Sequence, residues 1–155
     1  MNWDAIGATA EFLGAIGVVV SLFYLGSQLR RNSRALEAAT NQAVADATQE
    51  RLLAPAQNSE LAAAYSKSQT GESLSPTEET QLAFFSRATF RGIQNAFFQH
   101  RKGLISDEVW RDYEQVLINL SGVPHIEGWW STERNTYDSD FVDIYEALIS
   151  SASID

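Results

Sequence analysis

The sequence predicts an all-α protein, with an N-terminal transmembrane helix continuing into a long cytoplasmic helix and then a small helical bundle. Three observations support this. Residues 5–29 are almost uniformly apolar, no segment of useful length alternates with the period of a strand, and the later segments carry helix cap and stop signals. We therefore expect a transmembrane anchor over residues 1–29, its cytoplasmic extension over residues 30–54, and a helical cytoplasmic domain over residues 55–155.

The anchor is predicted from its length and its flanks. A helix from Ala5 to Leu29 rises about 37 Å, which exceeds the roughly 30 Å of a hydrocarbon core. Its only charge is Glu11. A buried helix of a soluble protein is usually shorter and carries a polar stripe. A cleaved signal peptide would begin with positive charge and end at a small-x-small site, and this sequence has neither feature.

The charges beside the span predict its orientation. Arg30, Arg31 and Arg34 follow the span directly, and no Lys or Arg precedes it. The positive-inside rule then places the N-terminus outside and the rest of the chain in the cytoplasm. We expect the three arginines to contact lipid headgroups, with Trp3 and Tyr24 at the outer and inner interfaces.

Small residues recur along the span. Alternating steps of three and four separate Gly7, Ala10, Gly14, Gly17 and Ser21, which is the spacing of a left-handed helix pair. Helices associate in lipid through close packing, so this small-residue stripe predicts a docking face. The partner is either another copy of the chain or a different membrane protein.

Glu11 is the intramembrane polar residue, about one and a half turns inside the outer boundary. An ionised carboxylate there costs about 3 kcal/mol on insertion scales, so it should face a partner, water or a proton. Two interpretations stay open. Glu11 is either an ion, proton or inter-helix hydrogen-bond site, or it extends toward the nearby outer surface.

Helix-forming residues continue beyond the span without Gly or Pro until Pro55, which predicts one rod of roughly 75 Å from Trp3 to Leu53. Its cytoplasmic half has a weak apolar face for packing on the domain or on a neighbouring rod. The members of this face are Leu36, Ala39, Ala43, Ala47 and Leu52.

Cap signals divide the domain into five further helices. They are expected at about residues 58–67, 76–102, 106–120, within 125–135, and 138–150. The starts are marked by Asn58 or Ser59, by Ser75 before Pro76, and by Ser106. Gly103 marks one end, and Gly122 with Pro124 another.

The helix over residues 76–102 is expected to form the centre of the domain, because it is apolar on two sides. Its aromatic side chains predict core packing rather than a cofactor site. One face comprises Leu82, Phe85, Thr89, Ile93, Ala96 and Phe97, and the second strip comprises Phe84, Ala88 and Phe98.

Arg87 and Arg91 lie one turn apart on that helix. Buried arginines need carboxylate partners, which Glu114, Glu133 or Asp143 would supply. The sequence favours a salt-bridge network, and the alternative is a small-anion pocket.

Composition excludes several classes of function. Twenty acidic and 11 basic residues give a net charge of -9, which argues against a nucleic-acid partner. There is no cysteine, and His100 is followed by Arg101 and Lys102, which would repel a metal ion. Phosphate-loop, dinucleotide, nucleophile-elbow and zinc-protease motifs are absent. We therefore expect no catalytic residues, no metal and no cofactor, and a protein that is not an enzyme.

Several segments together resemble a known family. They are the span, RRNSRALEAATNQ, FRGIQNAFFQHRKGLISDEVW, the Trp129–Trp130 pair and the closing acidic-aromatic helix. The chain resembles, over nearly its whole length, a family of short uncharacterised bacterial proteins with one N-terminal transmembrane helix and a helical cytoplasmic domain. The resemblance implies a bacterial inner membrane and no established catalytic residues. Family members carry Gly-Gly-Arg before the Trp pair, and this chain has Pro124–Gly128 instead.

These features predict a single-pass scaffold or accessory subunit that self-associates or joins a membrane complex through the small-residue stripe. Two alternatives are a homo-oligomeric pore or ion-responsive protein with Glu11 along its axis, and a cytoplasmic small-anion sensor.

Overall fold

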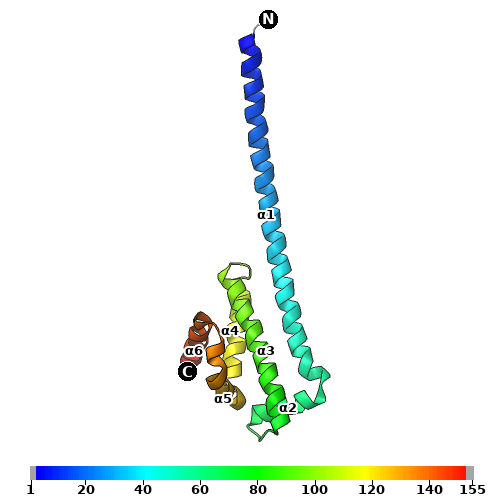
Figure 1. Cartoon of the computed structure of the whole chain (residues 1–155), viewed down its shortest axis with the longest axis vertical. Coiled ribbons are helices and arrows are strands. Elements are labelled where there is room, and N and C mark those ends of the chain that lie inside the picture. The colour runs from blue at the N-terminus through cyan, green and yellow to red at the C-terminus, as the bar shows by residue number, and fades with distance from the viewer. Residues whose placement is uncertain (1–2, 153–155) are drawn as a thin grey trace. The chain divides into compact units, whose positions relative to one another are not determined.

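The computed structural model describes the backbone of residues 3–152 and the side chains of residues 11–152. Within that part the chain is all-α, with no strand, as the sequence predicted (Figure 1). The elements are α1 (Trp3–Gln57), α2 (Ser59–Thr70), α3 (Pro76–Arg101), α4 (Asp107–Ser121), α5 (Pro124–Glu133), the short 3₁₀ helix η1 (Arg134–Thr136) and α6 (Ser139–Ala152).

The chain is divided into two compact units, Met1–Ala39 and Thr40–Asp155. The first unit is the N-terminal part of α1. The second contains the end of α1 together with α2 to α6, and is called the domain below. The boundaries predicted after residues 29 and 54 divide the chain by expected environment, and they stay predictions.

The expected caps begin the domain helices. Asn58 Oδ1 accepts the backbone N–H groups of Glu60 and Leu61 at 3.0 and 3.1 Å. Ser75 and Glu78 form a reciprocal capping box, in which the Glu78 N–H donates to Ser75 Oγ at 3.3 Å and the Ser75 N–H donates to Glu78 Oε2 at 2.7 Å. These contacts satisfy N–H groups that a helix start leaves without backbone partners.

The end of α1 differs from the prediction. The helix runs through Pro55 to Gln57, whereas the sequence predicted an end near Leu53. Pro55 lacks an N–H and so cannot donate to the carbonyl four residues earlier, but in the last turn this costs a single hydrogen bond. The helix ends where Asn58 adopts an extended conformation and caps α2.

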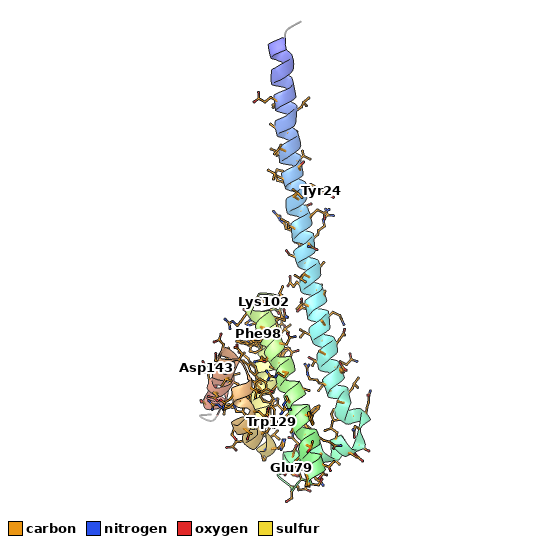
Figure 2. All side chains as sticks on the ribbon, in the orientation of Figure 1. Tyr24, Glu79, Phe98, Lys102, Trp129 and Asp143 are labelled. Atoms are coloured by element: carbon orange, nitrogen blue, oxygen red, sulfur yellow. The ribbon has the colours of Figure 1, made fainter. Side chains whose placement is uncertain are left out.

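Aromatic side chains from α3, α5 and α6 cluster in the core of the domain. Phe90 of α3 is fully buried, and its ring centroid lies 5.0 Å from that of Trp129, 5.2 Å from that of Trp130 and 5.2 Å from that of Tyr145. Tyr137, between η1 and α6, completes the cluster. Figure 2 shows Trp129 among the domain helices. Of the aromatic residues on the predicted core face, Phe97 is buried and Phe85 is half-buried, whereas Phe90 was not part of that prediction.

The second apolar strip of α3 is not buried as predicted. Phe84 is 63% exposed and Ala88 is exposed, while Phe98 is half-buried. The domain has too few helices to enclose α3, and α2 and α4 contact only part of its surface. The Arg87 guanidinium lies 5.6 Å from the Phe84 ring centroid and partly covers it.

The end of α1 packs on the other helices of the domain through residues outside the predicted face. Val44 is buried in the core, and Thr48 Oγ1 lies 2.7 Å from Tyr113 Oη of α4. Of the predicted face, Leu36 and Leu52 are 57% and 70% exposed, Ala39 and Ala43 are exposed, and Ala47 is half-buried. Val44, Thr48 and Arg51 therefore make the contact with the other domain helices, and packing of the predicted face on a neighbouring rod stays a prediction.

Candidate functional site

The apolar part of α1 is long and apolar enough, by length and composition, to cross a membrane. Its most hydrophobic 18-residue window has a mean hydropathy of 1.8, and none of that window is buried. Large side chains such as Phe12 and Phe23 are 65% and 77% exposed. Exposure of so many apolar side chains is typical of a surface that contacts lipid or another protein.

Polar side chains in this segment bond within their own helix. Ser21 Oγ donates to the Gly17 carbonyl and Ser27 Oγ to the Tyr24 carbonyl, both at 2.8 Å. Gln28 Nε2 donates to Tyr24 Oη at 2.8 Å. Figure 2 shows Tyr24 projecting from α1. Internal partners of this kind are what a helix requires where water is absent.

The small-residue stripe is open where the structure describes it. A Cβ atom built on Gly14 or Gly17 would meet no other atom within 4 Å. A partner helix can therefore approach the backbone closely on this side. The predicted members Gly7 and Ala10 lie outside the residues whose side chains are described.

The charged residues between positions 11 and 34 of α1 are exposed. Among the side chains of residues 11–152, none forms an ion pair with Glu11, Arg30, Arg31 or Arg34. Contact of the three arginines with lipid headgroups stays a prediction. Both interpretations of Glu11 remain predictions.

Arg87 forms the expected ion pair with Glu133. Its Nη2 lies 2.7 Å from Glu133 Oε1 and its Nε 3.3 Å from Oε2, a two-pronged contact between α3 and α5. The hydrogen bond to Glu133, and then the charge of Glu133, raise the pKa of Arg87. Glu114 has a different role, since it accepts the indole N–H of Trp110 at 2.8 Å.

Arg91 has no carboxylate partner among the described residues, which corrects the expectation of a buried pair. The side chain is exposed and donates to the Thr136 carbonyl at 2.8 Å and to Gln94 Oε1 at 3.0 Å. Its guanidinium lies 4.2 Å from the Tyr137 ring centroid. Thr136 ends η1, where carbonyl groups lack helical partners, so a cation is favoured there.

The sequence did not predict the buried Tyr137 hydroxyl or the contact between α1 and α3. Burial raises the pKa of the Tyr137 hydroxyl to about 12, with Arg91 acting in the opposite direction. On α1, the Arg51 guanidinium donates to Thr48 Oγ1 at 3.0 Å and lies against Gly92 of α3, where an added Cβ would overlap it. A glycine inside a predicted helix was the available signal for such a close approach.

The remaining candidates for chemistry have structural contacts. Within the described part of the chain, no three His, Cys, Asp or Glu side chains are grouped to hold a metal ion. His100 Nε2 lies 2.9 Å from Asp107 Oδ1, and its ring stacks on that of Trp110 with centroids 5.5 Å apart. These contacts join the end of α3 to the start of α4.

Comparison of the chain with family models, with curated proteins and with solved structures finds no match. The family resemblance therefore stays a prediction.

Proposed function

We propose that this protein is a single-pass, membrane-anchored scaffold or accessory subunit. The observation that carries the proposal is the exposed apolar part of α1, followed at once by Arg30, Arg31 and Arg34. Exposed apolar surface of this extent is stable in lipid, and the arginines fit the anionic headgroups beside it.

The charge distribution supports an orientation with the N-terminus outside and the domain in the cytoplasm of a bacterial inner membrane. Three arginines follow the span within five residues, so the positive-inside rule favours keeping that side of the span in the cytoplasm. The net charge of the whole chain, -9, also favours keeping the domain away from anionic lipid.

The open small-residue stripe is the proposed docking face within the membrane. Its partner is another copy of the chain or a subunit of a larger complex. A scaffold requires no reaction chemistry, and the ion pair between Arg87 and Glu133 favours a structural role for that arginine over anion binding.

Native mass spectrometry of the detergent-extracted complex tests this function. We expect a defined assembly that Gly14→Leu disrupts, because the new side chain blocks close helix approach. Val20→Leu is the matched control, an exposed apolar position on another side of α1 that should leave the assembly intact. A chain that is monomeric without detergent would contradict the proposal.

A further inference from the structure

Leucines remain exposed on α1 beyond the apolar span. Leu29 and Leu36 are 68% and 57% exposed, and Arg30 and Arg34 lie between them in the sequence. Leu36 is about 9 Å further along the helix axis than Arg30, on the side away from the span. Lipid that covers Leu22 and Leu25 therefore does not extend to Leu36, whose apolar surface needs a protein partner.

These leucines belong to one regular repeat, which we name the heptad seam. Steps of three and four alternate without interruption along it, and every member is exposed. A repeat of 3.5 residues keeps one face of a helix toward a partner helix in a left-handed coiled coil. The seam comprises Ala15, Val18, Leu22, Leu25, Leu29, Asn32, Leu36 and Ala39.

The heptad seam is distinct from the small-residue stripe. Gly17 and Ser21 each precede a seam member by one residue, which places them about 100° away around the helix. The next core position before Ala15 would be Glu11. Carboxylates facing each other there would repel, so the seam is taken to begin at Ala15.

Charges are arranged so that copies of the chain can meet along the seam. The residues directly beside it are uncharged, namely Gly14, Val19, Ser21, Gly26, Gln28, Ser33 and Ala35. All four charges between residues 12 and 39 occupy the outer positions of the repeat, and they are Arg30, Arg31, Arg34 and Glu37. Identical helices would therefore approach without like-charge repulsion at the flanking positions that govern coiled-coil pairing.

Asn32 is the single polar member of the seam. Its amide is both donor and acceptor, so the Asn32 side chains of two aligned copies complete each other's hydrogen bonds. A lone polar core residue in a coiled coil costs stability but fixes register. This requirement favours an identical partner aligned in parallel over an unrelated apolar helix.

We propose that residues 15–39 pair in parallel and in register with the same residues of another copy of this chain, as a coiled coil that begins in the membrane and continues past the arginines. The parallel direction rests on the proposed membrane anchorage, which gives every copy the same orientation. The assembly would bring the domains of the paired copies to the same membrane surface.

Disulfide cross-linking of the full-length chain in its own membranes tests the pairing. The natural sequence has no cysteine, so each single substitution is the only thiol. The seam variants are Leu22→Cys, Leu29→Cys and Leu36→Cys, and the matched outer variants are Phe23→Cys and Ala38→Cys. Core positions of aligned helices face each other closely enough for a disulfide, and outer positions do not. We expect several-fold more cross-linked homodimer from the seam variants than from the outer variants.

The outcomes separate this proposal from the proposed function. Equal cross-linking at seam and outer positions, cross-links only to a different protein, or no cross-links overturns the pairing. Strong links from Leu22→Cys and Leu36→Cys, each to its own counterpart, support the parallel register. Carbonate extraction of the same membranes tests anchorage independently. A chain that stays in the pellet but gives no cross-linked homodimer would contradict the pairing and leave the proposed anchorage intact.

Discussion

At the scale of single residues, the best-defined polar contact of the domain is the carboxylate of Glu78. It accepts the Ser75 N–H and an ion-pair hydrogen bond of 2.7 Å from Lys67 Nζ of α2. The bond from Lys67, followed by those from Ser75, lowers the pKa of Glu78 from 4.5 to about 2. One side chain thus caps α3 and joins α3 to α2.

Glu78→Gln tests this contact through the pH dependence of stability. Because the pKa is lower in the folded state, ionised Glu78 stabilises the fold fully above pH 4.5, and this contribution is lost as pH falls toward about 2. The wild type should exceed the variant in stability at pH 7, and the difference should shrink across that window. Urea unfolding followed by tryptophan fluorescence measures it. Glu108→Gln, at an exposed carboxylate in the first turn of α4, should retain the wild-type profile.

Residue contacts were predictable where one side chain demands a particular chemical partner. A partly buried arginine requires an acceptor, so the sequence placed Glu133 among three candidate carboxylate partners, although it did not choose between them. The acceptor of Arg91 is a backbone carbonyl at Thr136. Every residue carries such a carbonyl, so no residue type identified it.

At the scale of elements, α3 has one buried face and one exposed strip that look alike in sequence. Phe90 is fully buried against Trp129, Trp130 and Tyr145, and Phe84 is 63% exposed. Alanine substitution of each should separate the two faces. Phe90→Ala should cost about 3–5 kcal/mol of unfolding free energy, because it leaves a cavity in the core.

Phe84→Ala is the matched control for this prediction, and it should change the free energy of unfolding by no more than about 0.5 kcal/mol. Urea denaturation in detergent, followed by fluorescence of the domain tryptophans, measures both variants. Equal losses from the two substitutions would contradict the assignment of faces.

Element boundaries were predicted well because caps are local. Asn58, Ser75 and Ser106 begin helices by bonding N–H groups two or three residues away. The buried side of each helix was predicted less well, since burial depends on how many other helices surround it. Pro55 illustrates the same difficulty, because the free-energy cost of a proline in a helix is small when the proline lies in the final turn, as it does in α1.

At the scale of the whole molecule, one part of the chain exposes a long apolar surface and the other folds around its own core. Large apolar side chains are exposed along residues 12–29, whereas in the domain they are mostly buried. A long apolar helix followed by arginines could be predicted from sequence, since hydropathy and helix-forming residues suffice for it, and its place in a membrane stays a prediction. The partner could not, because the small-residue stripe fits another copy and a foreign helix equally.

Topology labelling in cells tests the membrane orientation most directly. Two single-cysteine variants of the full chain are used, Asn2→Cys before the span and Glu72→Cys in the exposed loop after α2. We expect a membrane-impermeant maleimide to label Asn2→Cys in intact spheroplasts, and to label Glu72→Cys only after lysis. Labelling of Glu72→Cys in intact spheroplasts, or recovery of the chain in the soluble fraction, would contradict the account.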